Sequence, residues 1–208
     1  MNTRVDTVIF DLGGVLIDWS PFHLYRKIFN NDAEIARFLK EIDLFNWLLG
    51  ADADKPFQAG IEELAARLPH LAEPILAYWH RWPETINGTF DDTLAVVAEL
   101  REQNVPLYVI SNWSSETWRH AEHYPFLEWF NGVVISGLER VAKPDRRIFD
   151  ITCERYNLTP AHCVFIDDMG DNVNSASALG FHGIQFHDAR SLRQHCVVLG
   201  LLPGLKAS

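Results

Sequence analysis

The chain contains four short runs of residues that are apolar at almost every position. The first, Thr7–Phe10, ends at Asp11, and the others span residues 107–110, 133–135 and 163–166. Continuous apolar runs of this length, rather than alternating ones, are typical of strands buried on both faces of a parallel sheet. Each run is followed directly by polar residues, so four buried strands with polar carboxyl ends are predicted.

The segments after the first strand carry apolar residues at helical spacing. Between the later strands we expect helices over residues 91–103, 146–156 and 172–179. Strands that alternate with helices predict a parallel α/β sheet with helices on both faces. In such sheets, ligands bind outside the carboxyl ends of the strands, where the polar residues of this chain fall.

Residues 17–86 break this alternation. Apolar residues recur there at helical spacing, as at Ile35, Phe38 and Ile42, and no strand is expected among them. We therefore predict an α/β core formed by residues 1–16 and 87–208, interrupted by an all-helical inserted domain over residues 17–86.

The amino-acid composition limits the partners and the cellular location that can be expected. The chain is 48% hydrophobic and 22% charged, as in packed globular proteins, and its formal net charge is −10. An acidic surface makes nucleic acid and anionic membranes poor partners. The three cysteines have no paired spacing, and no stretch approaches 18 apolar residues, so we expect a cytoplasmic protein without a disulfide framework.

Four polar clusters follow the expected strands or lie close to their ends. They are Asp11 with Gly13, Ser111 with Asn112, Lys143, and Asp167 with Asp168. Each cluster alone is commonplace, because such residues are frequent in turns. Their occurrence in this order at one edge of a sheet indicates a shared site.

Phosphoryl transfer requires such a set of residues. A carboxylate such as Asp11 can attack phosphorus, but it repels the phosphate unless a hard cation lies between them. Mg²⁺ binds oxygen ligands, which Asp11, Asp168 and the carbonyl of Gly13 can supply. Lys143 would neutralise a second phosphate oxygen, and the Ser111 hydroxyl and the Asn112 main-chain N–H would donate to a third.

At these residues the sequence resembles the haloacid dehalogenase-like hydrolase superfamily over essentially its whole length. Residues 10–16 are similar to its first motif, Ser111 to its second, Lys143 to its third and Asp167-Asp168 to its fourth. The resemblance implies a Rossmann-like core with a helical cap inserted after the first strand. It also implies catalysis through an aspartyl-phosphate on Asp11, with Mg²⁺ bound directly by Asp168 and supported by Asp167.

One position departs from the common pattern of this superfamily. Its usual first motif has a second Asp two residues after the nucleophile, which protonates the leaving group, and here that residue is Gly13. General acid–base catalysis is typically worth about 10²- to 10⁴-fold. We therefore expect a preference for good leaving groups, such as anomeric sugar phosphates or acyl phosphates. Asp18 is close enough in sequence to be considered as a substitute acid.

The main prediction is a Mg²⁺-dependent phosphatase that acts on a small phosphorylated metabolite, such as a sugar phosphate. Two alternatives stay open: a 2-haloacid dehalogenase, which needs neither metal nor a second Asp, and a non-catalytic ligand-binding protein. Asp167-Asp168 favours the phosphatase, since adjacent carboxylates repel without a cation. Trp19, Arg26 and Trp113 are candidates for the substrate pocket.

Overall fold

The computed structural model describes residues 4–53 and 55–204, and its centre is a five-stranded parallel sheet. The strand order is β5-β4-β1-β6-β7. The strands are β1 Thr7–Phe10, β4 Leu107–Ser111, β5 Gly132–Ile135, β6 Cys163–Asp167 and β7 His182–Gln185. Because β1 lies between β4 and β6, the residues that follow these three strands are neighbours. The strand β7 was not predicted from the sequence, since it is an edge strand in which only Ile184 is buried.

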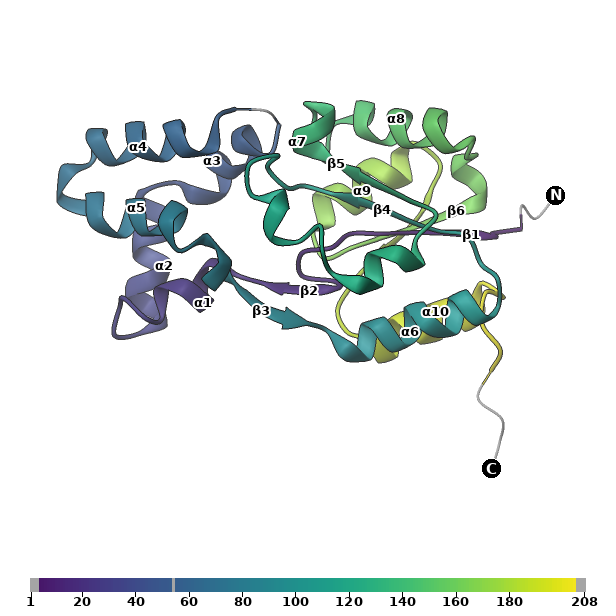
Figure 1. Cartoon of the computed structure of the whole chain (residues 1–208). Coiled ribbons are helices and arrows are strands. Elements are labelled where there is room, and N and C mark those ends of the chain that lie inside the picture. The colour runs from purple at the N-terminus through teal and green to yellow at the C-terminus, as the bar shows by residue number, and fades with distance from the viewer. Residues whose placement is uncertain (1–3, 54, 205–208) are drawn as a thin grey trace.

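Helices cover both faces of this sheet (Figure 1). One face packs against α6 Asp91–Glu102 and α10 Ala189–Val198, and the other against α8 Arg146–Tyr156 and α9 Gly170–Ala178. The central strand β1 contributes side chains to the hydrophobic core on both faces of the sheet, since Val8 and Phe10 belong to one buried cluster and Ile9 to the other. The predicted α/β fold with a Rossmann-like parallel sheet is thereby confirmed.

The segment expected to form a cap contains five α-helices, which lie together beyond one end of the sheet (Figure 1). They are α1 Pro21–Tyr25, α2 Asp32–Glu41, α3 Leu44–Ala51, α4 Phe57–Arg67 and α5 Ala72–His80. Their interior is aromatic, with Tyr25 stacked on Tyr78 at a ring-centroid distance of 6.1 Å. None of the helices in the described part of the chain is long and apolar enough to cross a membrane.

Two short strands connect the helical segment to the core. The strands β2 Ile17–Trp19 and β3 Ile86–Thr89 pair in antiparallel fashion, which corrects the expectation that residues 17–86 are helical throughout. Strands of three and four residues with polar positions carry too little periodicity to be recognised in sequence. The division into a core and a cap at residues 17 and 86 stays a prediction.

Several single-turn elements complete the chain. They are the short helix α7 Ser136–Glu139 and the 3₁₀ turns η1 Pro69–Leu71, η2 Trp82–Thr85, η3 Trp118–His120, η4 Pro125–Trp129 and η5 Pro160–His162. Figure 1 shows that the loop after β4 passes between the sheet and the helical segment. This loop contributes several of the residues described next.

Candidate active site

Lys143 is the centre of the polar cluster at the carboxyl edge of the sheet. Its Nζ lies 2.9 Å from Oδ1 of Asp11 and 2.7 Å from Oδ2 of Asp167, and it also donates a hydrogen bond of 2.9 Å to the carbonyl of Ile110. The lysine side chain is completely buried. Burial alone would lower its pKa, but the two carboxylates raise it above the ordinary value, so the lysine is held as a cation.

Asn112 positions the backbone of this lysine. The side-chain amide of Asn112 donates to the Lys143 carbonyl at 2.8 Å and accepts from the Lys143 N–H at 2.7 Å. Its neighbour Ser111 is buried, and the Ser111 hydroxyl has no hydrogen-bond partner within the described residues. A buried hydroxyl without a partner is costly, so this group is available to a ligand oxygen.

The two adjacent aspartates differ in their surroundings. Asp167 is fully buried and accepts hydrogen bonds from Lys143, from the Met169 N–H at 2.9 Å and from the Asn172 amide at 3.0 and 3.1 Å. Asp168 is half-buried and lines the cavity above the sheet. Asp167 is therefore held within the core, whereas Asp168 faces the space in which a ligand would bind.

Asp11, Asp167 and Asp168 together fit a divalent cation. Each offers a carboxylate oxygen, and these three atoms lie within 4.8 Å of one another. Burial, together with the charges of Asp167 and Asp168, raises the pKa of Asp11 to about 7 despite the opposing effect of Lys143. Crowded hard oxygen donors that repel one another are what Mg²⁺ would stabilise.

The glycines at positions 13 and 14 differ in whether the structure leaves room for a side chain. Gly14 has a φ of +74°, and a Cβ there would lie 2.7 Å from Oδ2 of Asp168, so a side chain would disturb the acidic cluster. At Gly13 an added Cβ would meet only the Cβ of Trp19 at 3.9 Å, an ordinary contact. An acidic side chain could therefore be accommodated at position 13, so the fold does not require the glycine that is found there.

A cavity of about 460 Å³ separates this edge from the helical segment. Trp19 and Trp113, two of the three residues expected at the pocket, line it together with Asp11 and Asp168. Arg26, the third, does not line it. Its guanidinium instead forms an exposed ion pair of 2.7 Å with Asp32.

Asp18 is not placed as a substitute acid. Its carboxylate accepts a hydrogen bond from Asn87 at 3.0 Å and lies 2.8 Å from Nε2 of His23, outside the residues that line the cavity. Burial opposes the shift, but these hydrogen bonds lower the pKa of Asp18, so it is ionised and committed to its neighbours.

Asp52 is a carboxyl group of this cavity that the sequence analysis missed. It follows α3 and lines the cavity with Tyr78 and Ser114. Burial raises its pKa to about 7, although Lys143 and the Ser114 N–H act in the opposite direction. No sequence pattern indicates its role, because Asp52 reaches the cavity only through the packing of α3 against the loop after β4.

The fold and the acidic cluster are those of a hydrolase built on a Rossmann-like sheet. A family model described as haloacid dehalogenase-like hydrolase matches residues 5–180, and the chain belongs to this family. Among solved structures, it is similar to a wild-type haloacid dehalogenase family enzyme from Bacteroides thetaiotaomicron in complex with magnesium and inorganic phosphate. That likeness has a TM-score of 0.64 and 24% identity, and covers 90% of this chain and 98% of the other.

Other relatives differ in activity. The L-2-haloacid dehalogenase of Xanthobacter autotrophicus is similar with a TM-score of 0.66 and 21% identity, covering 96% of this chain and 85% of the other. A sesquiterpene phosphatase, astK, of Aspergillus oryzae is 24% identical over 91% of this chain and 93% of its own length. Acyl-CoA dehydrogenase family member 10 of Mus musculus is 26% identical over 86% of this chain, which spans only 17% of that protein.

Proposed function

We propose that this protein is a Mg²⁺-dependent phosphatase that hydrolyses a small phosphorylated metabolite through an aspartyl-phosphate on Asp11. The observation that carries the proposal is the cluster of three carboxylates around the buried Lys143. Mg²⁺, when bound by Asp11, Asp168, the Gly13 carbonyl and, in a supporting role, Asp167, would supply positive charge that lets carboxylate and phosphate approach. The sesquiterpene phosphatase relative supports this class of reaction.

The residues of the chain divide the reaction among them. An oxygen of Asp11 forms a bond to phosphorus as the bond to the leaving oxygen breaks, and water later cleaves the acyl phosphate. The Lys143 ammonium, the Ser111 hydroxyl and the Asn112 main-chain N–H stabilise the charge on the phosphoryl oxygens. Because position 13 is glycine, the leaving oxygen takes its proton from water or from a group elsewhere in the cavity.

The alternative function, a haloacid dehalogenase, has structural neighbours of similar fold, but similarities at 20–21% identity support the fold alone. In that reaction, Asp11 would displace halide from carbon without a metal. Burial first, and then the neighbouring carboxylates, raise the pKa of Asp11 and of Asp168. This crowding favours the metal-dependent reaction, since a metal-free site gains nothing from Asp168 beside Asp11. In a non-catalytic protein, the buried Lys143 would serve only to stabilise the fold by neutralising Asp11 and Asp167.

Magnesium dependence tests the proposal directly. We expect acetyl phosphate or an aryl phosphate to be hydrolysed with Mg²⁺, and the rate to fall at least about 100-fold in chelator and in Asp11→Asn. Wild-type protein is expected to bind beryllofluoride with Mg²⁺, and Asp11→Asn is not. Chelator-resistant release of chloride from 2-chloropropionate, with no phosphate release, would establish the dehalogenase instead. Fractionation of cells would test the expected cytoplasmic location.

A further inference from the structure

The cavity above Asp11 is lined mainly by large apolar and aromatic side chains. They are Trp19, Phe45, Leu48, Leu49, Phe57, Tyr78, Trp82, Trp113 and Met169. A volume of about 460 Å³ is in the usual range for sites that take small organic ligands, at about 300–1,000 Å³. The space beyond the phosphate-binding edge is therefore suited to an apolar group.

Exposed apolar residues gather at this cavity. Within the described residues, six large hydrophobic side chains are exposed, and three of them line the cavity: Phe45 at 56%, Leu49 at 47% and Met169 at 57%. Phe45 and Leu49 belong to α3 of the helical segment, whereas Met169 follows the aspartate pair of the core. Apolar surface gathered from two parts of a chain around one cavity is typical of a ligand-binding site.

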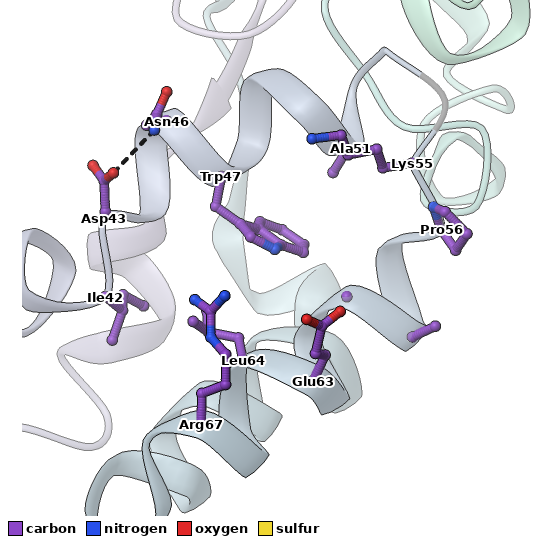
Figure 2. Close-up of a pocket in the computed structure, with 12 residues that line it drawn as sticks. Ile42, Asp43, Asn46, Trp47, Ala51, Lys55, Pro56, Glu63, Leu64 and Arg67 are labelled. Atoms are coloured by element: carbon purple, nitrogen blue, oxygen red, sulfur yellow. Dashed lines mark hydrogen bonds between the residues drawn. The ribbon is translucent and has the colours of Figure 1, made fainter.

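The charged residues that line this cavity disfavour an anionic leaving group. Of the described residues that line it, the charged ones are Asp11, Asp52 and Asp168, and none is a lysine or arginine. A second cavity, inside the helical segment, provides the contrast (Figure 2): its lining includes Lys55, Glu63 and Arg67. An apolar lining without lysine or arginine therefore distinguishes the cavity that contains the nucleophile from this second cavity.

Two residues of the cavity lining could nevertheless donate hydrogen bonds to a ligand. Tyr78 and Trp113 line this cavity, and the Tyr78 hydroxyl and the Trp113 indole N–H are buried without a hydrogen-bond partner among the described residues. Two unsatisfied donors can be met by one or two oxygen atoms. The other polar side chains of the lining are already engaged: Asn112 bonds to Lys143, Asn172 to Asp167, Asn46 to Asp43, and Ser114, Thr117 and Asp52 to neighbouring backbone groups. Two free donors are too few for the several hydroxyls of a sugar, each of which needs a partner once it leaves water.

We propose that this cavity selects phosphate monoesters of bulky, uncharged, mainly apolar alcohols over sugar phosphates. The proposal rests on the phosphatase function proposed above and names the substrate class of the same site. It replaces the sugar phosphate that the sequence analysis offered as an example. Leaving groups of this class would bury their hydrocarbon against Phe45 and Leu49 while the phosphate lies at Asp11.

A series of 4-alkylphenyl phosphates, from methyl to hexyl, tests the proposal, because their phenols are nearly identical leaving groups. We expect kcat/KM with Mg²⁺ to rise about two- to fourfold for each methylene that the cavity buries. Glucose 1-phosphate and 4-carboxyphenyl phosphate are expected to be at least about tenfold poorer than the hexyl ester. A rate that is flat in chain length, or a preference for either polar ester, would overturn the proposal.

Binding of 4-alkylbenzylphosphonates to the wild-type protein with Mg²⁺, measured by calorimetry, separates this proposal from the phosphatase function. Affinity that rises with alkyl length supports the apolar site even if no ester is hydrolysed, and affinity that does not rise refutes it even if hydrolysis is fast.

Two leucines provide a matched pair of variants. Leu49→Asn is expected to lower the hexyl-to-methyl ratio of kcat/KM several-fold, whereas Leu138→Asn, at an exposed leucine (59%) outside the cavity lining, is expected to leave it unchanged. Equal effects of the two substitutions would also refute the proposal. Hydrolysis of acetyl phosphate, which has no group to reach α3, reports whether each variant is folded and active.

Discussion

The core edge and the helical segment face the same cavity, but they are built in opposite ways. At the core edge, Lys143, Asp11 and Asp167 are buried and joined by contacts below 3.0 Å. On the other side, Phe45 and Leu49 of α3 are about half exposed and bring apolar surface rather than charge. Preorganised charge suits the chemical step, whereas an accessible apolar surface suits recognition of a leaving group.

This difference leads to a general expectation about substitutions. Changes at the core edge are expected to alter hydrolysis of every ester to a similar extent, because each ester presents the same phosphate. Changes on the helical side are expected to alter the choice among esters. Single substitutions on each side of the cavity test this division.

Lys143→Met is expected to lower hydrolysis of acetyl phosphate and of all aryl esters by at least about 100-fold, since it removes the cation that, in the proposed reaction, stabilises the phosphoryl oxygens. It also leaves Asp11 and Asp167 buried without their counter-charge, which is expected to cost roughly 3–5 kcal/mol of folding free energy. Chemical denaturation and initial rates measure the two effects. Lys55→Met, at an exposed lysine of the helical segment, is the control; a stable, active Lys143→Met protein would contradict the central role of this lysine.

Gly13→Asp is expected to change how the rate depends on the leaving group. Because an added side chain at position 13 meets only Trp19 at an ordinary distance, an acid can be accommodated there. Wild-type rates on aryl phosphates of graded leaving-group pKa are expected to fall steeply as that pKa rises. The variant is expected to flatten this dependence and to gain up to about 10²-fold on the poorest leaving groups.

Gly14→Ala is the matched control for this substitution. Its Cβ would press on Asp168, and its φ of +74° disfavours a side chain, so activity is expected to fall on every ester. A wild-type rate that hardly depends on leaving-group pKa would show that another proton donor already serves the site.

The strand ends could be predicted from the sequence, but the cavity could not. Continuous apolar runs that stop at Asp11, Ser111 and Asp167 specify buried parallel strands, and topology then brings their ends together. The apolar lining depends on how α3 and α5 pack over the sheet, which no local spacing encodes. The same limit applies to Arg26 and Asp18, because local spacing does not show which ion-pair and hydrogen-bond partners they have in the helical segment.

Asp52→Asn is expected to change the pH dependence of binding and stability. Because burial raises the pKa of Asp52 to about 7, the carboxyl is neutral below that pH and places a charge in an apolar cavity above it. The wild-type KM for 4-hexylphenyl phosphate is therefore expected to rise above pH 7, and that of Asp52→Asn to stay flat across the same range.

Proton linkage determines whether the ionisation of Asp52 raises or lowers the stability of the folded protein as the pH changes. The unfolded chain ionises Asp52 near its ordinary pKa, so the folded state bears a cost that grows as the pH rises and levels off above about 7. Asp52→Asn is expected to stabilise the protein more at pH 8 than at pH 5, by at most about 3 kcal/mol. Equal effects at both pH values, in denaturation experiments, would contradict this assignment.

Glu116→Gln is expected to have the smallest effect, because it weakens the contact between the two sides at a residue that does not itself line the cavity. The Glu116 carboxylate accepts hydrogen bonds from the N–H groups of Phe57 at 2.5 Å and Gln58 at 3.2 Å, at the start of α4. The residue before that helix, Pro56, provides no side-chain cap, so the core supplies the acceptor that the helix N-terminus needs.

The amide of the Glu116→Gln variant keeps an acceptor oxygen but loses the charge that favours a helix N-terminus, a loss of roughly 0.3–1 kcal/mol. We expect KM for 4-hexylphenyl phosphate to rise about two- to fivefold, because α3 and α4 are held less firmly over the sheet. The kcat for acetyl phosphate is expected to stay the same, as is every parameter of Glu122→Gln, at an exposed glutamate of the core. If Glu116→Gln instead slowed both substrates equally, the contact would belong to the catalytic edge, and the division between reaction and recognition would not hold at this loop.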